Sequence, residues 1–202
     1  MKNKGFQAIV IILLLGLIGS LGYMLIKGPE EKIGVIKKAP DFELTNVDGK
    51  KMSLADTAGK ARLVYFYFST CPDVCSPTTY TISKIQDKLV EKGVFGTKTA
   101  FLSISFDPKK DTQAQLQQFA NRFHYDPKGW FFLRGEDETA MMELAQKYGI
   151  MVVKDAGADT FSHTNYILLV DGKGDIRTYY NGSDVDLDLD KVVNDLIKIS
   201  KE

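Results

Sequence analysis

The chain of 202 residues contains few of the side chains on which most metal sites and catalytic sites depend. It has two cysteines, Cys71 and Cys75, and two histidines, His124 and His163. Lys plus Arg and Asp plus Glu each number 26, so the formal net charge is zero. A basic excess typical of nucleic-acid-binding proteins is therefore missing, and we expect no nucleic-acid partner. A domain of this length needs no disulfide to fold. Two cysteines four positions apart therefore indicate a reactive or metal-binding role more than a stabilising one.

Charge is also missing from residues Phe6 to Ile26. A helix of this length would extend about 30 Å, which matches the hydrocarbon thickness of a bilayer. We expect residues 1–27 to form one transmembrane anchor. The alternative is a cleaved signal peptide, but the apolar run is long for one and no Ala-x-Ala cleavage site follows it.

The side of the membrane on which the rest of the chain lies is harder to predict. Four lysines follow the apolar run and two precede it, which taken alone favours a cytoplasmic location for the rest of the chain. Long domains, however, are translocated largely regardless of charge. We expect a single-pass protein of the plasma membrane, with residues 28–39 as a polar linker and residues 40–202 as one extracytoplasmic domain.

The remaining residues have the pattern of an α/β layer fold with a mixed sheet. Composition supports a globular domain, with 44% hydrophobic and 26% charged residues. Asp48-Gly49 is typical of a hairpin turn between residues 41–45 and 50–54. Continuous apolar runs predict buried strands at 62–68, 99–106 and 165–170. Helical spacing follows the first two strands and returns at 136–148 and from Asp186 onward.

The two cysteines lie where the first buried strand is predicted to end and the next helix to begin. A helix N-terminus favours the thiolate form, which attacks disulfides and binds soft metals. Three residues separate Cys71 from Cys75, which leaves room for a metal between the sulfurs. The alternative is a plain disulfide or two buried thiols, but so short a loop would gain little entropy from closure.

Two cysteines make a poor metal site without a third ligand, and histidine is a natural candidate. His163 directly precedes the strand predicted at 165–170. Taken alone, it is as readily a structural residue as a metal ligand. His124 follows a predicted helix and has no partner motif, so we expect a surface or capping role for it.

Three motifs in this order resemble the SCO/SenC family of thioredoxin-fold copper proteins. They are Phe68-Ser-Thr-Cys71-Pro-Asp-Val-Cys75, Ser103-Ile-Ser-Phe-Asp107-Pro-Lys-Lys-Asp111-Thr112, and Ser162-His163 followed by Tyr166 to Ile176 and Tyr180-Asn-Gly182. The resemblance runs from Pro40 to about the C-terminus. One departure is Ser76, where many members carry proline.

The resemblance implies a thioredoxin-like fold, here with an N-terminal β-hairpin extension and one preceding transmembrane helix. It also implies copper, as Cu(I), Cu(II) or both, bound by Cys71, Cys75 and His163. The implied role is assembly of the copper centre of a respiratory cytochrome oxidase. The expected partners are the copper-binding subunit of cytochrome c oxidase, a further copper carrier as a second candidate, and the membrane.

Two other activities would use the same cysteines. In a thiol–disulfide reductase, Cys71 would attack a partner disulfide, Cys75 would resolve the intermediate, and His163 would be dispensable. A peroxiredoxin-like peroxidase ranks last, because Thr70 is near but no supporting arginine stands out. Asp73 could tune the site from outside the ligand set. Asp111 or Thr112 is expected to cap a helix, and neither aspartate is expected to be a ligand.

Overall fold

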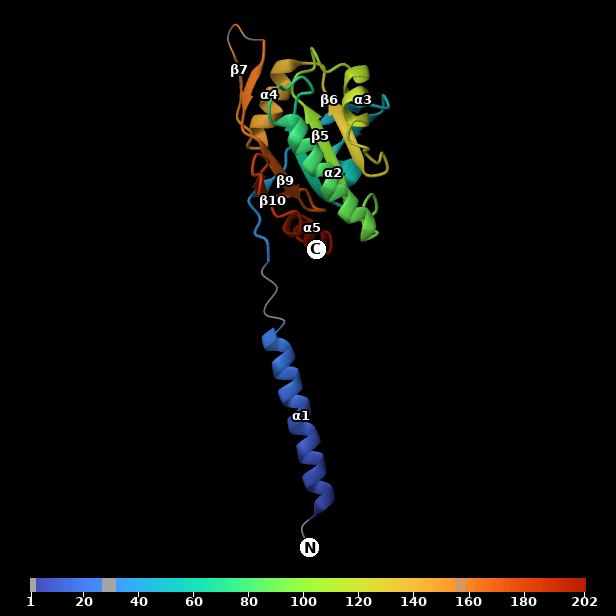
Figure 1. Cartoon of the computed structure of the whole chain (residues 1–202), viewed down its shortest axis with the longest axis vertical. Helices are drawn as coiled ribbons and strands as arrows, with labels where there is room; N and C mark the ends of the chain where they lie inside the picture. Colours follow the sequence, from blue (N-terminus) through green and yellow to red (C-terminus); the bar gives the residue numbers. More distant parts are fainter. Residues whose placement is uncertain (1–2, 27–31, 156, 158) are drawn as a thin grey trace. The chain divides into compact units, whose positions relative to one another are not determined.

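The computed structural model describes residues 3–26, 32–155, 157 and 159–202, which fall into two compact units, Met1–Lys32 and Ile33–Glu202 (Figure 1). The first unit is the helix α1 (Lys4–Ile26), whose 23 residues correspond to about 35 Å. Its large apolar side chains from Phe6 to Tyr23 are exposed. The helix is long and apolar enough to cross a membrane, although a signal sequence has the same properties.

The second unit is built on an eight-stranded mixed sheet in the order β1-β10-β9-β4-β5-β6-β2-β3. Its strands are β1 (Lys37–Lys38), β2 (Glu43–Asn46), β3 (Lys51–Ser53), β4 (Ala61–Tyr67), β5 (Thr99–Ser105), β6 (Trp130–Arg134), β9 (Tyr166–Val170) and β10 (Asp175–Asn181). Strands β4, β5 and β6 run parallel, and β9 pairs antiparallel with β4. Every residue of β4 and β5 is buried, as their continuous apolar sequences predict.

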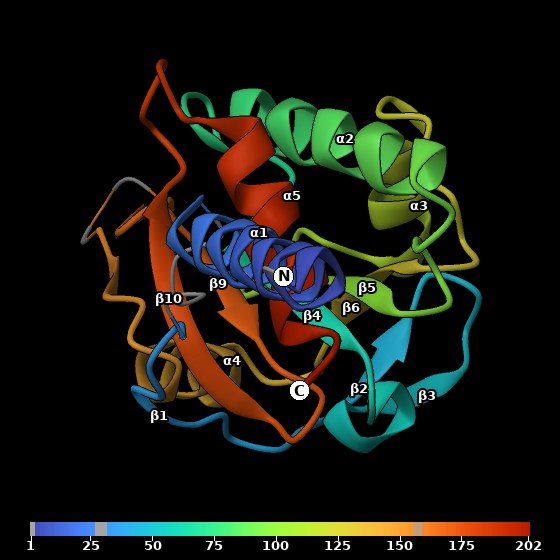
Figure 2. The same ribbon diagram turned by 90° about the horizontal axis from the view of Figure 1, so that it is seen from below.

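Four α-helices cover the two faces of this sheet. They are α2 (Cys75–Glu91), α3 (Gln113–Asn121), α4 (Glu138–Lys147) and α5 (Leu189–Ile199), and a 3₁₀ turn spans Leu54–Thr57. Tyr67 stacks on Phe119 of α3, while its neighbour Phe66 packs on Tyr148 at the end of α4. Successive strand residues point to opposite faces, so α3 and α4 lie on opposite sides. Figure 2 shows α2 and α5 together on the side away from α4.

The hairpin predicted before the first buried strand is present as β2 and β3. Gly49 in its turn has φ +83°, a conformation that glycine adopts without steric penalty. The hairpin joins the edge of the main sheet by pairing β2 with β6, so it is an N-terminal extension of the α/β fold.

A second, two-stranded sheet was not predicted. It consists of β7 (Val152–Lys154) and β8 (Phe161–His163), paired antiparallel. His163 is thus the last residue of a short hairpin, and not simply the start of the following strand.

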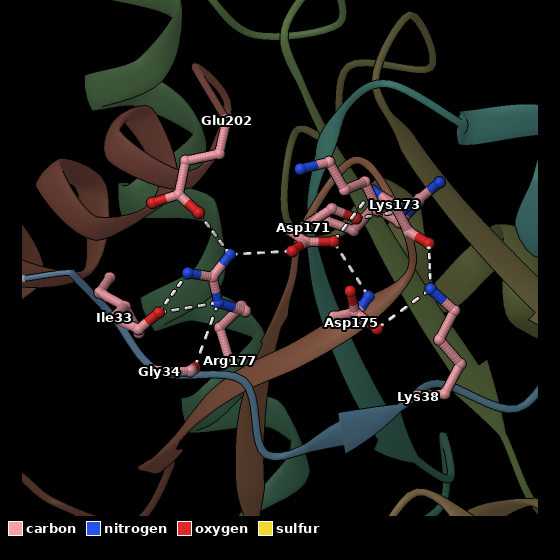
Figure 3. Close-up of polar contacts among 9 residues, drawn as sticks. Ile33, Gly34, Lys38, Asp171, Lys173, Asp175, Arg177 and Glu202 are labelled. Atoms are coloured by element: carbon pink, nitrogen blue, oxygen red, sulfur yellow. Dashed lines mark hydrogen bonds and ion pairs between the residues drawn. The ribbon is translucent and has the colours of Figure 1, made fainter.

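A buried arginine on β10 ties three segments of the second unit together (Figure 3). The Arg177 guanidinium forms ion pairs with Asp171 at 2.8 Å and with Glu202 at 2.6 Å. It also donates hydrogen bonds to the backbone carbonyls of Ile33 and Gly34. Part of the segment predicted as a linker is therefore bound along the β10 edge of the sheet.

Candidate metal centre

The two cysteines lie where β4 passes into α2, as predicted. Cys75 is the first residue of α2, and Cys71 lies in the loop before it, where its N–H donates to the carbonyl of Phe68 at 3.2 Å. Both thiols are free. Cys71 itself precedes the helix. The two sulfurs lie close together because the loop that carries Cys71 turns back toward the N-terminus of α2.

The histidine at the end of β8 reaches the same place. One ligand atom each from Cys71, Cys75 and His163 lie within 4.8 Å of one another. Cys75 Sγ is 3.7 Å from His163 Nε2. Two ligands of one metal ion are at most about 4.6 Å apart, twice a typical metal–sulfur distance. The three side chains are therefore close to the spacing of a three-ligand metal site, and small side-chain rotations would bring all three atoms onto one ion.

A backbone contact selects the form of the imidazole that can bind a metal. His163 Nδ1 is 3.1 Å from the carbonyl oxygen of Thr164. A carbonyl only accepts, so Nδ1 carries the proton in this contact. Nε2 is then unprotonated, and it is the nitrogen that faces Cys75. An imidazole held by its other nitrogen in this way is typical of metal-binding histidines.

Aromatic side chains fix the position of this ring. His163 packs edge-on against Phe68, with ring centroids 5.9 Å apart, and against Phe106, at 5.2 Å. Phe161 packs against both phenylalanines. We name Phe68, Phe106 and Phe161 the aromatic wall. Sequence reasoning missed it, because its members come from three segments that only the fold brings together.

The two thiols differ in exposure and in acidity. Cys71 is half-buried and Cys75 is fully buried. A hydrogen bond from Cys75 lowers the pKa of the Cys71 thiol, against the effect of burial. The pKa of Cys75 is raised by that same interaction with Cys71 and by burial. Cys71 is therefore the more acidic thiol of the pair, and Cys75 the less acidic.

A network of side-chain hydrogen bonds supports the first turn of α2. Tyr65 donates to Asn165 at 3.0 Å, and Asn165 donates to Thr78 on α2 and to Ser183, both at 2.9 Å. Thr78 in turn donates to the carbonyl of Gly182 at 3.0 Å. These bonds connect β4, the residue before β9 and the loop after β10 to the helix that carries Cys75.

Two of the remaining predicted residues have clear positions. His124 is exposed and pairs with Asp87 at 3.1 Å, as expected for a surface residue. Asp111 does not cap α3, because Thr112 is the N-cap and accepts from the Gln115 N–H. Of the two residues expected to cap this helix, Thr112 is confirmed, and the capping role expected for Asp111 was wrong.

Asp111 instead lies buried beneath the cysteine loop. Its carboxylate accepts hydrogen bonds from the Ser69 N–H at 3.0 Å, from the Ser69 hydroxyl and from the Ser105 hydroxyl. It thereby holds Ser69, two residues before Cys71. Burial raises the pKa of this carboxyl, although the hydrogen bonds oppose that effect.

The site opens into a cavity of about 440 Å³. Cys71 and His163 line it together with Asp73, Asp155 and Ser183, so the half-buried sulfur is accessible from this side. Asp73 is an exposed residue of the cavity wall.

Comparisons with known proteins agree with this geometry. The family model described as SCO1/SenC matches residues 31–199. The SCO1 protein homolog of Bacillus subtilis (strain 168) is 32% identical over 142 residues, which is 70% of this chain and 72% of the relative. The solved structure of BsSco, described as a member of the Sco family of cytochrome c oxidase assembly proteins with a disulfide switch, superposes with a TM-score of 0.75. It is 28% identical, over 86% of this chain and 99% of that one.

A further solved structure, Bradyrhizobium japonicum ScoI with copper bound, is 25% identical with a TM-score of 0.67. It covers 80% of this chain and 99% of its own. The thioredoxin-like α/β fold is thus confirmed, and this chain belongs to the SCO1/SenC family.

Proposed function

We propose that this chain binds copper through Cys71, Cys75 and His163 and delivers it to the copper centre of a respiratory cytochrome oxidase. The receiving partner would be the copper-binding subunit of cytochrome c oxidase. Another copper carrier would be the source. The proposal extends to this chain what is described for its relatives, namely bound copper and oxidase assembly.

The observation that carries the proposal is the meeting of three soft or borderline donor atoms within 4.8 Å. Two sulfurs and one imidazole nitrogen suit Cu(I), and a further weak ligand such as water would suit Cu(II). Three ligands leave copper under-coordinated, and the cavity in front of Cys71 leaves room for a partner's ligands to enter. Those are the properties that a transfer site requires.

The proposed location is the outer face of the plasma membrane, with α1 as a single uncleaved anchor. The apolar length of α1 supports the anchor. The domain is placed outside the cytoplasm because an oxidising compartment would let the same two sulfurs alternate between a copper-binding dithiol and a disulfide.

Copper titration of the reduced full-length chain in neutral detergent tests the proposal. Replacement of any ligand, as Cys71→Ser, Cys75→Ser or His163→Ala, should weaken copper binding by at least tenfold. The thiolate-to-copper absorption of the Cu(II) form should also fall. His124→Ala is the matched control, since it removes the other histidine and should change neither value. Unchanged affinity in all three ligand variants would refute the proposal.

A second candidate is a thiol–disulfide reductase. The difference in exposure and acidity between the two thiols favours it. The Cys71 thiolate would attack a partner disulfide, forming a mixed disulfide and releasing one partner thiolate. The Cys75 sulfur would then attack Cys71, lose its proton and release the second partner thiolate. Two electrons would pass to the partner, and the chain would keep a Cys71–Cys75 disulfide.

His163 separates the two activities, because the reductase needs no metal ligand from β8. His163→Ala should abolish copper delivery and leave reduction of a partner disulfide in place. Oxidase assembly can be scored in cells that express the variant in place of the original chain. Full assembly with His163→Ala would favour the reductase, and loss of assembly with intact disulfide reduction would favour copper delivery.

A further inference from the structure

The surface around the cysteines forms one continuous groove with negative charge along it. The 440 Å³ cavity beside Cys71 is adjoined by a second cavity of about 170 Å³. Both are lined by Asp73, Val74 and Ser183, so they meet at the loop between the two cysteines. The second cavity continues along the first turns of α2 to Val185.

The charges that line this groove are all of one sign among its described residues. Asp155 lies at one end, Asp73 in the middle and Asp184 at the other end, and no lysine or arginine lines either cavity. The one lysine of the neighbouring β7–β8 hairpin is already paired. Lys154 contacts Glu138 at 2.8 Å, and it lines a different cavity.

The groove also offers the contacts that an extended chain would use. Its floor at one end is formed by the first turns of α2, and Val185, 95% exposed, lies at that end. Cys71 opens into the same groove, whereas Cys75 is fully buried. A segment lying there would meet Cys71 first.

We propose that this groove binds an extended peptide segment of a partner protein in which a cysteine is flanked by lysine or arginine. The partner's cations would face Asp73 and Asp155, and its cysteine would lie against Cys71. The inference rests on the proposed function in one respect, since it takes Cys71 as the sulfur that meets the partner. The acidic side chains select which partner cysteines reach Cys71. They do not bind the metal themselves.

Thiol–disulfide exchange with small disulfides of opposite charge tests the inference without copper. The Cys71 thiolate attacks one sulfur of cystamine, which is cationic, so that a protein–cysteamine disulfide forms and one cysteamine thiolate leaves. Cys75 then displaces the second cysteamine and closes the protein disulfide. The same reaction with dithiodipropionate, which is anionic, provides the comparison. The measured quantity is the ratio of the two rates for the reduced full-length chain in uncharged detergent.

Each variant is compared with the unmodified chain, so the intrinsic reactivities of the two disulfides cancel. Asp73→Asn and Asp155→Asn should each lower the cystamine preference about two- to fivefold, as expected for loss of one exposed charge pair. The double variant should lower it further. Glu91→Gln is the matched control, because it removes the same charge at the other end of α2, about 24 Å away along the helix. It should leave the ratio unchanged, and about 1 M salt should remove the preference.

The peptide itself is tested with mixed disulfides of Gly-Lys-Cys-Lys-Gly and Gly-Glu-Cys-Glu-Gly. A preference for the lysine peptide that both aspartate variants reduce supports the inference. If Glu91→Gln lowered the rate ratio as much as Asp73→Asn does, the inference would be overturned. A preference for cystamine without a preference for the lysine peptide would also overturn it. Copper binding with no charge preference would refute this inference alone. A charge preference without copper binding would refute the proposed copper site alone.

Discussion

Replacing Arg177 with methionine should destabilise the second unit strongly while leaving the cysteine site intact. Arg177 and Asp171 are a buried ion pair, with side chains only 6% and 4% exposed. Methionine fills much of the same volume but leaves the Oδ2 oxygen of Asp171 without its charged partner. The change also releases the backbone carbonyls of Ile33 and Gly34, which lead into β1.

The size of the expected loss in unfolding free energy depends on the hydrogen bonds that Asp171 retains. Breaking a buried ion pair by removing one partner typically costs about 3–5 kcal/mol. Asp171 still accepts hydrogen bonds from the Lys173 and Asp175 N–H groups at 2.9 and 3.0 Å, so we expect the lower end, about 3 kcal/mol. For a unit of this size that corresponds to a fall in Tm of about 6–12 °C.

Denaturant unfolding of Arg177→Met beside the unmodified chain measures this loss. Lys88→Met is the control, because it removes the exposed Lys88–Asp190 pair and should change stability little. Cys71 and Cys75 should react with thiol reagents as before in the folded variant. A loss below about 1 kcal/mol at neutral pH would refute the assigned role of the buried pair.

The pH dependence provides a second check on the same pair. Burial acts to raise the pKa of Asp171, but the hydrogen bonds from Asp175, Arg177 and Lys173 hold it below its usual value. A depressed carboxyl pKa contributes stability above the unfolded pKa of about 3.9, and this is lost as pH falls through the folded pKa. The stability gap between Arg177→Met and the unmodified chain should therefore narrow below about pH 4.

Three further predictions concern the site itself. In Gly182→Ala the new Cβ would lie 2.9 Å from the methyl carbon of Thr78 on α2. Stability should therefore fall by about 1–3 kcal/mol, and copper affinity should weaken. Gly34→Ala is the control, because a Cβ there meets open space and should change neither value. Phe106→Leu should loosen the histidine and lower Cu(II) affinity in titration, and an unchanged affinity would show that the aromatic wall does not position the ring. Alkylation of Cys71 should persist well below the usual thiol pH range, because its pKa is lowered. Its midpoint should move to higher pH in Cys75→Ala, and an unmoved midpoint would contradict the hydrogen bond assigned to that pair.

Local sequence pattern predicted the elements that position the cysteines. Apolar runs of six to eight residues identified the buried strands, because a strand covered on both faces has no polar alternation. A glycine in a tight turn identified the β2–β3 hairpin. The two cysteines follow directly from the end of β4, so their place at a strand-to-helix junction needed no long-range information.

The hairpin that carries His163 was harder to predict. Each of its strands has only three residues, too few to establish a period, and it pairs only with itself. Its signals were the polar residues between Lys154 and Phe161, which are typical of a turn. The role of Asp111 was mispredicted for a related reason. A local rule assigned it to the helix beside it, whereas its partners lie on other segments.

The sequence by itself determined the soft ligand types, the cysteine spacing, the strand-to-helix junction and one apolar helix, since each depends on neighbouring residues. Only the tertiary structure decided that His163 Nε2 meets Cys75, that the aromatic wall lies against the imidazole and that Cys71 is the more exposed sulfur. It alone also showed Arg177 paired with Asp171 and the aspartates lining one groove. The physical reason is that burial, pKa and ligand geometry depend on groups that the chain brings together from distant positions.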